Sequence, residues 1–294
     1  MKRRPFLGLA PWGLCFAVFG IFPLAYALVL SFLSYNPLRP DLIRWVGLDN
    51  YAHALGSPSF WHALRTTAIF VAGTLPVTLI LGYVVAALLA RARRGEGFFR
   101  AAIFFPATLS MVVISLVFKS LYAEEGLLNG WMGALGLPHI QWLLDVRLAL
   151  PSIMAMDVWA SVGYYAILIL AARKTLPGEQ LEAARLEGIP PLLVERKIVL
   201  PHLRPVLLFV VLLNTIRAFQ IFIEPFVLTR GGPLESTLTL VYHIYERAFY
   251  HFEMGYASAL AFLLLLLVGL ILVVQRRVLG RGAAGAPAAR APAS

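Results

Sequence analysis

Charged and amide side chains lie inside long apolar stretches of this sequence, where they could bind a polar solute or pair with one another. Asp157 interrupts the uncharged stretch 148–172. The stretch 205–228 contains four more polar residues, namely Asn214, Arg217, Gln220 and Glu224. An ionised group at the centre of a membrane-spanning helix is unfavourable by about 2.5–3.5 kcal/mol on insertion scales, so such residues are candidates for function.

The four polar residues of 205–228 are predicted to form one stripe. At ~100° per residue they fall within an arc of roughly 120° on a helix, and that face must meet protein or water. Two interpretations remain open: the stripe lines a solute path, or Arg217 and Glu224 are paired and stabilise a helix contact. Pro225 frees the carbonyl four residues before it and is expected to kink the helix.

Asp157 is interpreted differently. On a helix it shares one face with Ser161 and Tyr164, whereas Trp159 points away from them. From the residues alone two roles stay open for Asp157: a functional group in a path through the membrane, or a buried acid that is hydrogen-bonded to a neighbouring helix.

Sequence motifs for catalysis, metal binding and nucleotide hydrolysis are missing. The chain contains no G-x-x-x-x-G-K-[ST] loop, no H-E-x-x-H and no G-x-S-x-G, and its six histidines have no ligand spacing. We therefore predict a chain that is not an enzyme and binds no metal or cofactor of its own. If it moves a solute actively, a partner must supply the energy.

Composition indicates a polytopic, all-α membrane protein. Sixty per cent of the 294 residues are hydrophobic and 14 per cent are charged, against about 45–50 and about 25 per cent in soluble domains. Six stretches approach the ~20 residues that cross a bilayer. They are 8–33, 66–90, 101–118, 148–172, 205–228 and 254–275.

The lysines and arginines predict the orientation. Most of the 25 basic residues fall at the N-terminus, in the second and fourth interspan segments and after the last span. The positive-inside rule then places both termini and the loop 173–204 in the cytoplasm. The net charge of +10 is explained by these loops, so nucleic-acid binding is not predicted. We expect one permease-like domain over residues 1–279 and a disordered cytoplasmic tail over 280–294.

The cytoplasmic loop has a recognisable design. Pro177 and Gly178 end the preceding span, the helix formers of 179–187 predict a helix of two to three turns, and Gly188 ends it. Pro190 and Pro191 start a second short helix. The loop is thus predicted to form a helix-turn-helix elbow.

The spacing within this elbow resembles the signature loop of the membrane permease subunits of binding-protein-dependent ABC importers. The matching positions are Glu182, Ala183, Ala184, Gly188, Ile198, Leu200 and Pro201. Shorter matches in chain order are similar to sugar-type permeases, in particular the first permease subunit of oligosaccharide and glycerol-phosphate uptake systems. They are Gly47-Leu48-Asp49-Asn50-Tyr51, Gly97-Phe98-Phe99-Arg100, Gly126-Leu127-Leu128-Asn129, Asp157-Val158-Trp159 and Thr229-Arg230-Gly231-Gly232-Pro233. One departure is Glu195, at a position where an aromatic residue is expected to pack the elbow.

This resemblance implies a type I ABC-importer permease in the inner membrane. It implies a second permease subunit, two cytoplasmic ATPase subunits that bind ATP and Mg, and an external solute-binding protein. The seven matching positions would then form the ATPase-coupling interface, and the stripe on 205–228 the candidate solute path. The Asp157-Val158-Trp159 match implies that Asp157 is a buried structural acid hydrogen-bonded to a neighbouring helix. The sequence does not name the solute. The alternative from another class is a secondary transporter driven by an ion gradient, for which internal repeats are expected but not evident.

Overall fold

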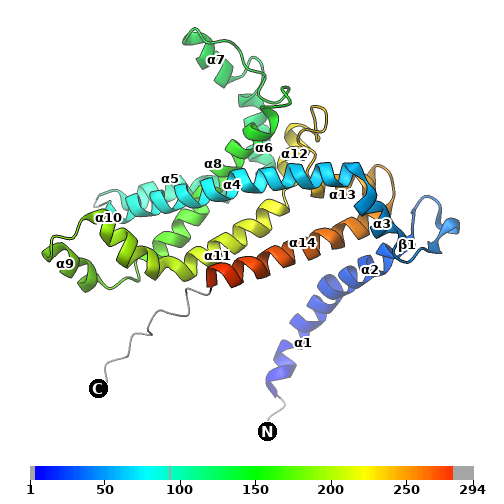
Figure 1. Ribbon diagram of the computed structural model, residues 1–294, viewed down its shortest axis with the longest axis horizontal. Coiled ribbons are helices and arrows are strands. Elements are labelled where there is room, and N and C mark those ends of the chain that lie inside the picture. Colours follow the sequence, from blue (N-terminus) through cyan, green and yellow to red (C-terminus); the bar gives the residue numbers. More distant parts are fainter. Residues whose placement is uncertain (1–3, 93, 281–294) are drawn as a thin grey trace. The chain divides into compact units, whose positions relative to one another are not determined.

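The computed structural model describes residues 4–92 and 94–280 and is helical through most of them (Figure 1). The first half of the helices comprises α1 (Arg4–Phe16), α2 (Phe22–Ser31), α3 (Asp49–Gly56), α4 (Pro58–Arg91), α5 (Glu96–Thr108), α6 (Met111–Leu121) and α7 (Leu127–Ala134). The second half comprises α8 (Ala149–Arg173), α9 (Gly178–Leu186), α10 (Pro191–Val194), α11 (Leu200–Phe219), α12 (Ile223–Leu228), α13 (Leu240–Phe249) and α14 (Met254–Gly280). The predicted tail from 281 onward lies outside the described residues.

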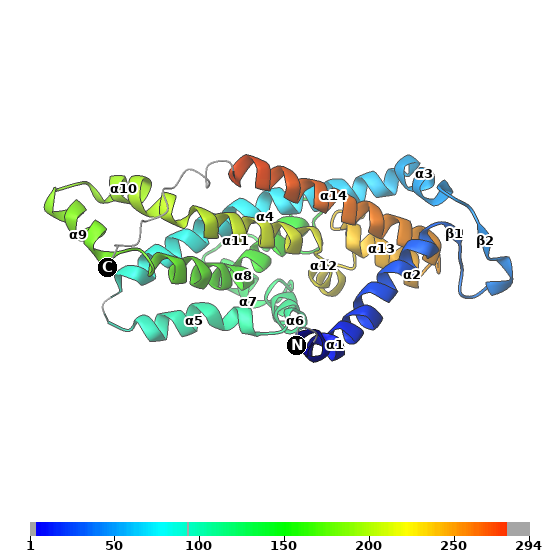
Figure 2. The same ribbon diagram turned by 90° about the horizontal axis from the view of Figure 1, so that it is seen from below.

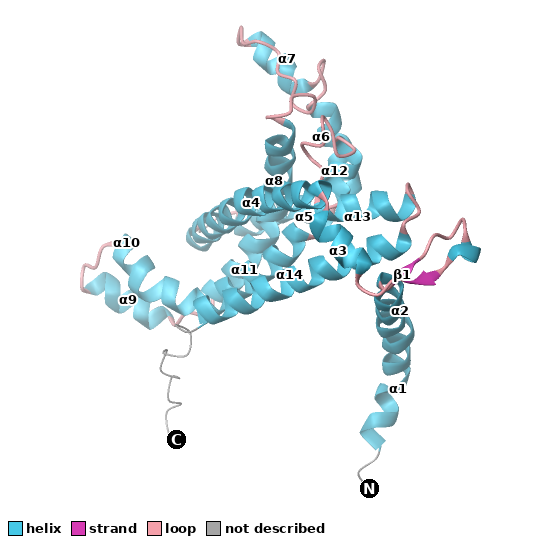
Figure 3. Ribbon diagram, turned by 45° about the vertical axis from the view of Figure 1, so that its right-hand side comes forward, coloured by secondary structure: helices cyan, strands magenta, loops and turns pink. Residues whose placement is uncertain are grey.

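Short turns and one strand pair complete the described chain. The helical turns are η1 (Ala17–Ile21), η2 (Pro40–Leu42) and η3 (Glu195–Val199). Strands β1 (Leu33–Ser34) and β2 (Arg44–Trp45) pair antiparallel, and Figure 3 draws them in magenta against the helices. The prediction of an all-helical membrane fold is confirmed.

Within the described residues, five helical segments are long and apolar enough to cross a membrane. They are Ala10–Ser31, Pro58–Arg91, Ala149–Arg173, Pro191–Leu228 and Met254–Leu279. A sixth crossing exists if α5 and α6 count as one span, because these two helices meet at a bend of 94°. The stretch 101–118, predicted as one span, is therefore bent: α5 ends at Thr108, and Leu109 has an extended conformation.

The fifth predicted span, 205–228, is also broken. α11 ends at Phe219 and α12 begins at Ile223, so the break precedes Pro225 and involves the residues just before it. Proline cannot donate to the carbonyl of Ile221, and the Thr239 hydroxyl donates to that oxygen instead, at 3.2 Å. The helix is thus interrupted just before Pro225, and the Thr239 side chain satisfies the carbonyl that Pro225 leaves free.

The chain groups into two compact units, each described by itself. Unit 1 comprises residues 1–64 and 240–267, and unit 2 comprises residues 65–239 and 268–294. In unit 1 the segment after α2 is held by side chains of α3. The Asn50 amide donates to the carbonyls of Ser31 (2.8 Å) and Leu33 (3.0 Å), and the Tyr51 hydroxyl lies 2.7 Å from the Ser31 hydroxyl. The prediction of one permease domain stays a prediction.

Unit 2 contains the helices that position the candidate site. α8 packs against α5 and α11, and α6 packs against α12; Figure 2 shows α5 running alongside α8. α8 approaches α5 closely at Gly163, since a Cβ atom there would collide with the carbonyl oxygen of Ile103. The helices α9 and α10 lie at one end of unit 2, beyond the ends of α4 and α8 (Figure 1).

Candidate functional site

An ion pair between a buried acid and a partly exposed arginine joins two membrane-embedded helices of unit 2. The Asp157 side chain on α8 is 1% exposed, and both of its carboxylate oxygens accept hydrogen bonds from the Arg217 guanidinium on α11, at 2.7 and 2.8 Å. This two-pronged geometry is the strong form of the arginine–carboxylate contact. Asp157 is therefore the buried acid bonded to a neighbouring helix that the sequence predicted.

The four residues of the predicted stripe have different surroundings. Asn214 and Arg217 lie on α11, Gln220 lies in the break, and Glu224 lies on α12. Only Asn214 and Arg217 therefore lie on one continuous helix, as the predicted stripe requires. Glu224 is buried, and it is close enough to interact electrostatically with both Asp157 and Arg217. The direct partner of Arg217 is Asp157 rather than Glu224.

Asn214 and Gln220 are the polar residues of this group without a structural partner in the described chain. Asn214 is 1% exposed, and neither its amide nitrogen nor its amide oxygen has a hydrogen-bond partner. Gln220 is exposed where α11 ends. A buried amide with unmet hydrogen-bonding capacity calls for a ligand, a water or another chain.

A pocket of about 250 Å³ adjoins Arg217. It lies at the bend between α5 and α6 and faces α8. Its lining residues are Pro106, Ala107, Leu109, Met111, Ile114, Ala160, Ser161, Tyr164, Tyr165 and Arg217. Two hydroxylated rings and one guanidinium in an apolar cavity can hold a hydroxyl-rich molecule by stacking and hydrogen bonding.

The elbow consists of α9, α10 and η3. α9 ends as predicted, because Gly188 has φ +68° and the N–H of Ile189 reaches back to the carbonyl of Ala184 at 3.0 Å. Pro191 opens α10, which continues through η3 into α11. The predicted helix-turn-helix is therefore present.

The predicted coupling residues divide by exposure. Glu182, Ala183, Gly188, Leu200 and Pro201 are exposed, whereas Ala184 is buried. Ile198 is half-buried and packs on an apolar cluster formed with α4, α8 and α11, so it holds the elbow in place. Two residues that the sequence analysis did not single out are strongly exposed for their type: Leu186 at 89% and Leu192 at 81%.

Glu195 fixes the elbow to two spans. Its carboxylate accepts hydrogen bonds from the Tyr83 hydroxyl on α4 (2.7 Å) and from both terminal nitrogens of Arg173 at the end of α8, one of them at 2.9 Å. Arg91 adds a longer contact at 3.5 Å. We call Tyr83, Arg173 and Glu195 the clasp. The expected aromatic contact is thus replaced by a charged one, which explains how the elbow seats without an aromatic residue.

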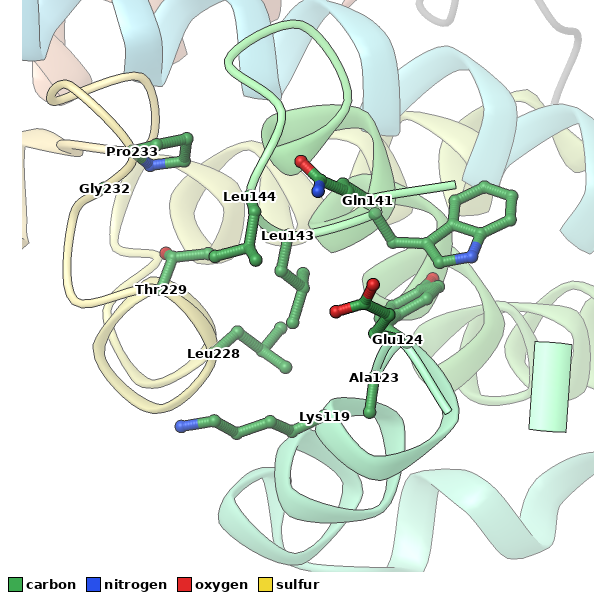
Figure 4. Close-up of a pocket in the computed structure, with 12 residues that line it drawn as sticks. Lys119, Ala123, Glu124, Gln141, Leu143, Leu144, Leu228, Thr229, Gly232 and Pro233 are labelled. Carbon is green, nitrogen blue, oxygen red and sulfur yellow. The ribbon is translucent and has the colours of Figure 1, made fainter. Parts of the chain in front are cut away.

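A second pocket, of about 350 Å³, lies at the other end of unit 2. It is formed by the end of α6, the loop before α8 and the segment after α12. Figure 4 shows Leu143 and Leu228 facing the same space as the Glu124 carboxylate, with Lys119 along one edge. The Lys119 ammonium donates to the carbonyl of Val227 at 3.1 Å. The sequence does not predict this pocket, because its residues come from three separate segments.

Comparison with known proteins decides the family. Residues 78–282 match the protein family described as "Binding-protein-dependent transport system inner membrane component". The chain belongs to this family. The permease is 32% identical over 275 residues to the "Lactose transport system permease protein LacF" of Rhizobium radiobacter, covering 92% of this chain and 91% of that protein. It is 30% identical over 271 residues to the "Probable ABC transporter permease protein YesP" of Bacillus subtilis (strain 168), covering 90% and 87%.

A solved structure shares the fold. The permease superimposes on a chain of a bacterial alginate ABC transporter, crystallised in complex with an alginate pentasaccharide-bound periplasmic protein, with a TM-score of 0.83. The match covers 95% of this chain and 94% of that chain at 15% identity. Family membership favours the ABC importer over the ion-driven secondary transporter. The chain is a multi-pass permease subunit of the inner membrane and not an enzyme.

The contacts among Asp157, Arg217 and Glu224 predict that substitutions in this group destabilise the permease to different degrees. Arg217→Met leaves two buried carboxylates, Asp157 and Glu224, without their cation and is expected to destabilise the permease by about 3–5 kcal/mol. Asp157→Asn should be milder, because Glu224 remains near the arginine. The measurement is the amount of monodisperse protein after heating, with Arg100→Met at an exposed helical ion pair as control. Equal midpoints for Arg217→Met and the control would contradict this account.

Removing the clasp is expected to let the elbow open locally. Arg173 and Glu195 are mostly buried, at 13% and 18% exposure of their side chains. Removing a hydrogen bond to a charged group weakens a structure by about 1.5–3 kcal/mol, so Glu195→Ala should speed amide hydrogen exchange over residues 178–199 by roughly tenfold or more. Glu96→Gln is the matched control. It breaks the ion pair between Glu96 of α5 and Lys174, and neither residue belongs to the elbow. Unchanged exchange in Glu195→Ala would show that the clasp does not hold the elbow.

Proposed function

We propose that the permease forms half of the translocation path for a sugar or sugar-like solute. The relatives support this substrate class, since their names include transport systems for lactose, arabinooligosaccharides and diacetylchitobiose. The hydroxylated and aromatic lining of the pocket beside Arg217 suits a solute rich in hydroxyl groups. In this proposal a second permease subunit forms the other half, and an external binding protein delivers the solute.

The observation that carries the mechanism is the exposed elbow tied to two spans. Two cytoplasmic ATPase subunits, which bind ATP and Mg, dock on the elbow through Glu182, Ala183, Gly188 and the neighbouring Leu186. Closure of the ATPase dimer displaces the elbow as a rigid body. The clasp passes that displacement to α4 and α8 together, because Glu195 bonds to a residue on each helix.

The remaining coupling positions connect the elbow to the rest of the permease and do not contact the ATPase. Ala184 and Ile198 pack inside the permease, whereas Leu200 and Pro201 open α11. Displacement of the elbow therefore continues into the helix that carries Asn214 and Arg217. Both termini and the elbow lie in the cytoplasm in this proposal, as the distribution of basic residues predicts.

The coupling role is tested at Gly188. Gly188→Asp places a charged side chain on a positive φ at the docking surface, which is unfavourable by on the order of 1 kcal/mol in the loop alone and adds an unpaired charge at the interface. We expect normal insertion, poor co-purification of the ATPase and no ATP-driven uptake by the assembled importer in proteoliposomes.

Gly178→Asp is the control for added charge. It introduces the same carboxylate at the start of α9, where φ is ordinary, space is open and an acid suits a helix N-terminus. This variant should keep the ATPase and transport normally. Normal uptake by Gly188→Asp would refute the coupling role, and labelling of Glu179→Cys from outside in a Cys15-free background would refute the orientation.

The solute path is tested at Asn214 and Gln220. If these amides contact solute, Asn214→Ala and Gln220→Ala should lower uptake of radiolabelled lactose or arabinooligosaccharides several-fold without lowering the amount of permease in the membrane. Asn36→Ala, in an exposed turn, is the control. Full uptake by both variants would exclude them from the path, and loss of folded protein would assign them a structural role instead.

A further inference from the structure

A pocket of about 460 Å³ separates the elbow from the ends of α4 and α8. Two of its lining residues, Arg173 and Glu195, belong to the clasp, but no role assigned above fills the space itself. Its lining residues are Ala90, Arg91, Arg173, Lys174, Leu176, Leu181, Arg185, Ile189, Pro191, Val194, Glu195 and Val199. The lining combines basic and aliphatic side chains.

The charge of the wall is strongly positive. It contains four basic residues and one acid. Arg173 is occupied by Glu195, and Lys174 pairs with Glu96 outside the wall. Arg91 makes only the 3.5 Å contact with Glu195, and its side chain is 63% exposed. Within the described residues Arg185 has no ion pair at all, so two guanidinium groups remain available to an anion.

The depth of the pocket points to the membrane surface. Arg91 and Arg173 are the last residues of two candidate spans, Pro58–Arg91 and Ala149–Arg173. Basic residues where spans end lie at the level of lipid headgroups. A pocket at this level is within reach of a phospholipid.

The aliphatic lining residues favour an amphiphile over a small anion as the occupant of this pocket. Leu181, Ile189 and Val194 offer no hydrogen bonds to a free phosphate ion, but they can cover the glycerol and upper acyl region of a lipid. Basic pockets between membrane helices on the cytoplasmic side are suited to anionic lipid headgroups.

We propose that this pocket binds an anionic phospholipid, with its phosphodiester held by Arg91 of α4 and Arg185 of α9. Bound in this way, the lipid bridges the end of a span and the elbow beside the clasp. Only the choice of the cytoplasmic leaflet rests on the proposed function. The lipid is thus a third element, after the clasp and the apolar cluster, that seats the elbow.

The test is retention of phosphatidylglycerol by the full-length permease. The purified protein is equilibrated with equimolar phosphatidylglycerol and phosphatidylcholine of matched acyl chains, and bound lipids are counted by native mass spectrometry. Wild type should prefer phosphatidylglycerol. The double variant Arg91→Gln/Arg185→Gln should lose at least roughly fivefold of that preference, since each basic residue near an anionic lipid is worth about that factor.

Arg196→Gln/Lys197→Gln is the matched control. It removes the same charge from exposed residues of η3 that do not line the pocket, and it should retain the preference. Equal losses in both double variants would overturn the proposal by showing a general charge effect. Displacement of the lipid by millimolar inorganic phosphate would overturn it in favour of a small-anion site.

Folding is checked separately, by the thermal midpoint of each variant. If the double variant unfolds, Arg185→Gln alone carries the test, since Arg185 lies on the exposed face of α9. No ATP or solute enters these measurements. A negative result would therefore remove the lipid site and leave the proposed transport function standing.

Discussion

Neutralisation of one buried carboxylate constrains the membrane-embedded part of unit 2. Asp157 can stay ionised there only with a cation at hydrogen-bonding distance, and Arg217 supplies it in a two-pronged geometry. This contact fixes how α8 and α11 face one another. Seven residues of unbroken helix would set Glu224 about two turns from Arg217. The helix break after Phe219 instead brings Glu224 within electrostatic reach of the same arginine. The residues that line the neighbouring pocket depend on this arrangement.

The short motifs shared with sugar-type permeases act as joints of the backbone. Asn129 donates to the carbonyls of Ala123, Glu124 and Ile140, closing the loop between α6 and α8. Thr229 meets the Thr237 hydroxyl at 2.7 Å, which closes the segment after α12. Asn50 plays the same part in unit 1. Irregular backbone next to a membrane needs such internal partners, so these positions specify the loops rather than the solute.

The sequence predicted what depends on local chemistry and missed what depends on distant contacts. Apolar run lengths located the spans, and the Gly188 cap followed from the helix formers before it. The bend between α5 and α6 left no strong signal, because Pro106 lies inside α5 and the interruption comes three residues later. Glu195 was recognised as unusual, but its partners Tyr83 and Arg173 are 112 and 22 residues away. The exposed Leu186 and Leu192 could have been flagged as apolar residues in an otherwise polar loop.

The elbow is held by the hydrogen bonds of the clasp and not by apolar packing of an aromatic residue, and this changes which substitutions it can accept. An aromatic ring on the elbow would accept any apolar neighbours of suitable volume, so each neighbour could vary alone. A carboxylate requires hydrogen-bond donors in defined places, and each donor left behind would in turn be stranded. Positions 83, 173 and 195 are therefore bound to co-vary: permeases of this family with an acid at the third position should retain a hydroxyl and a guanidinium at the first two.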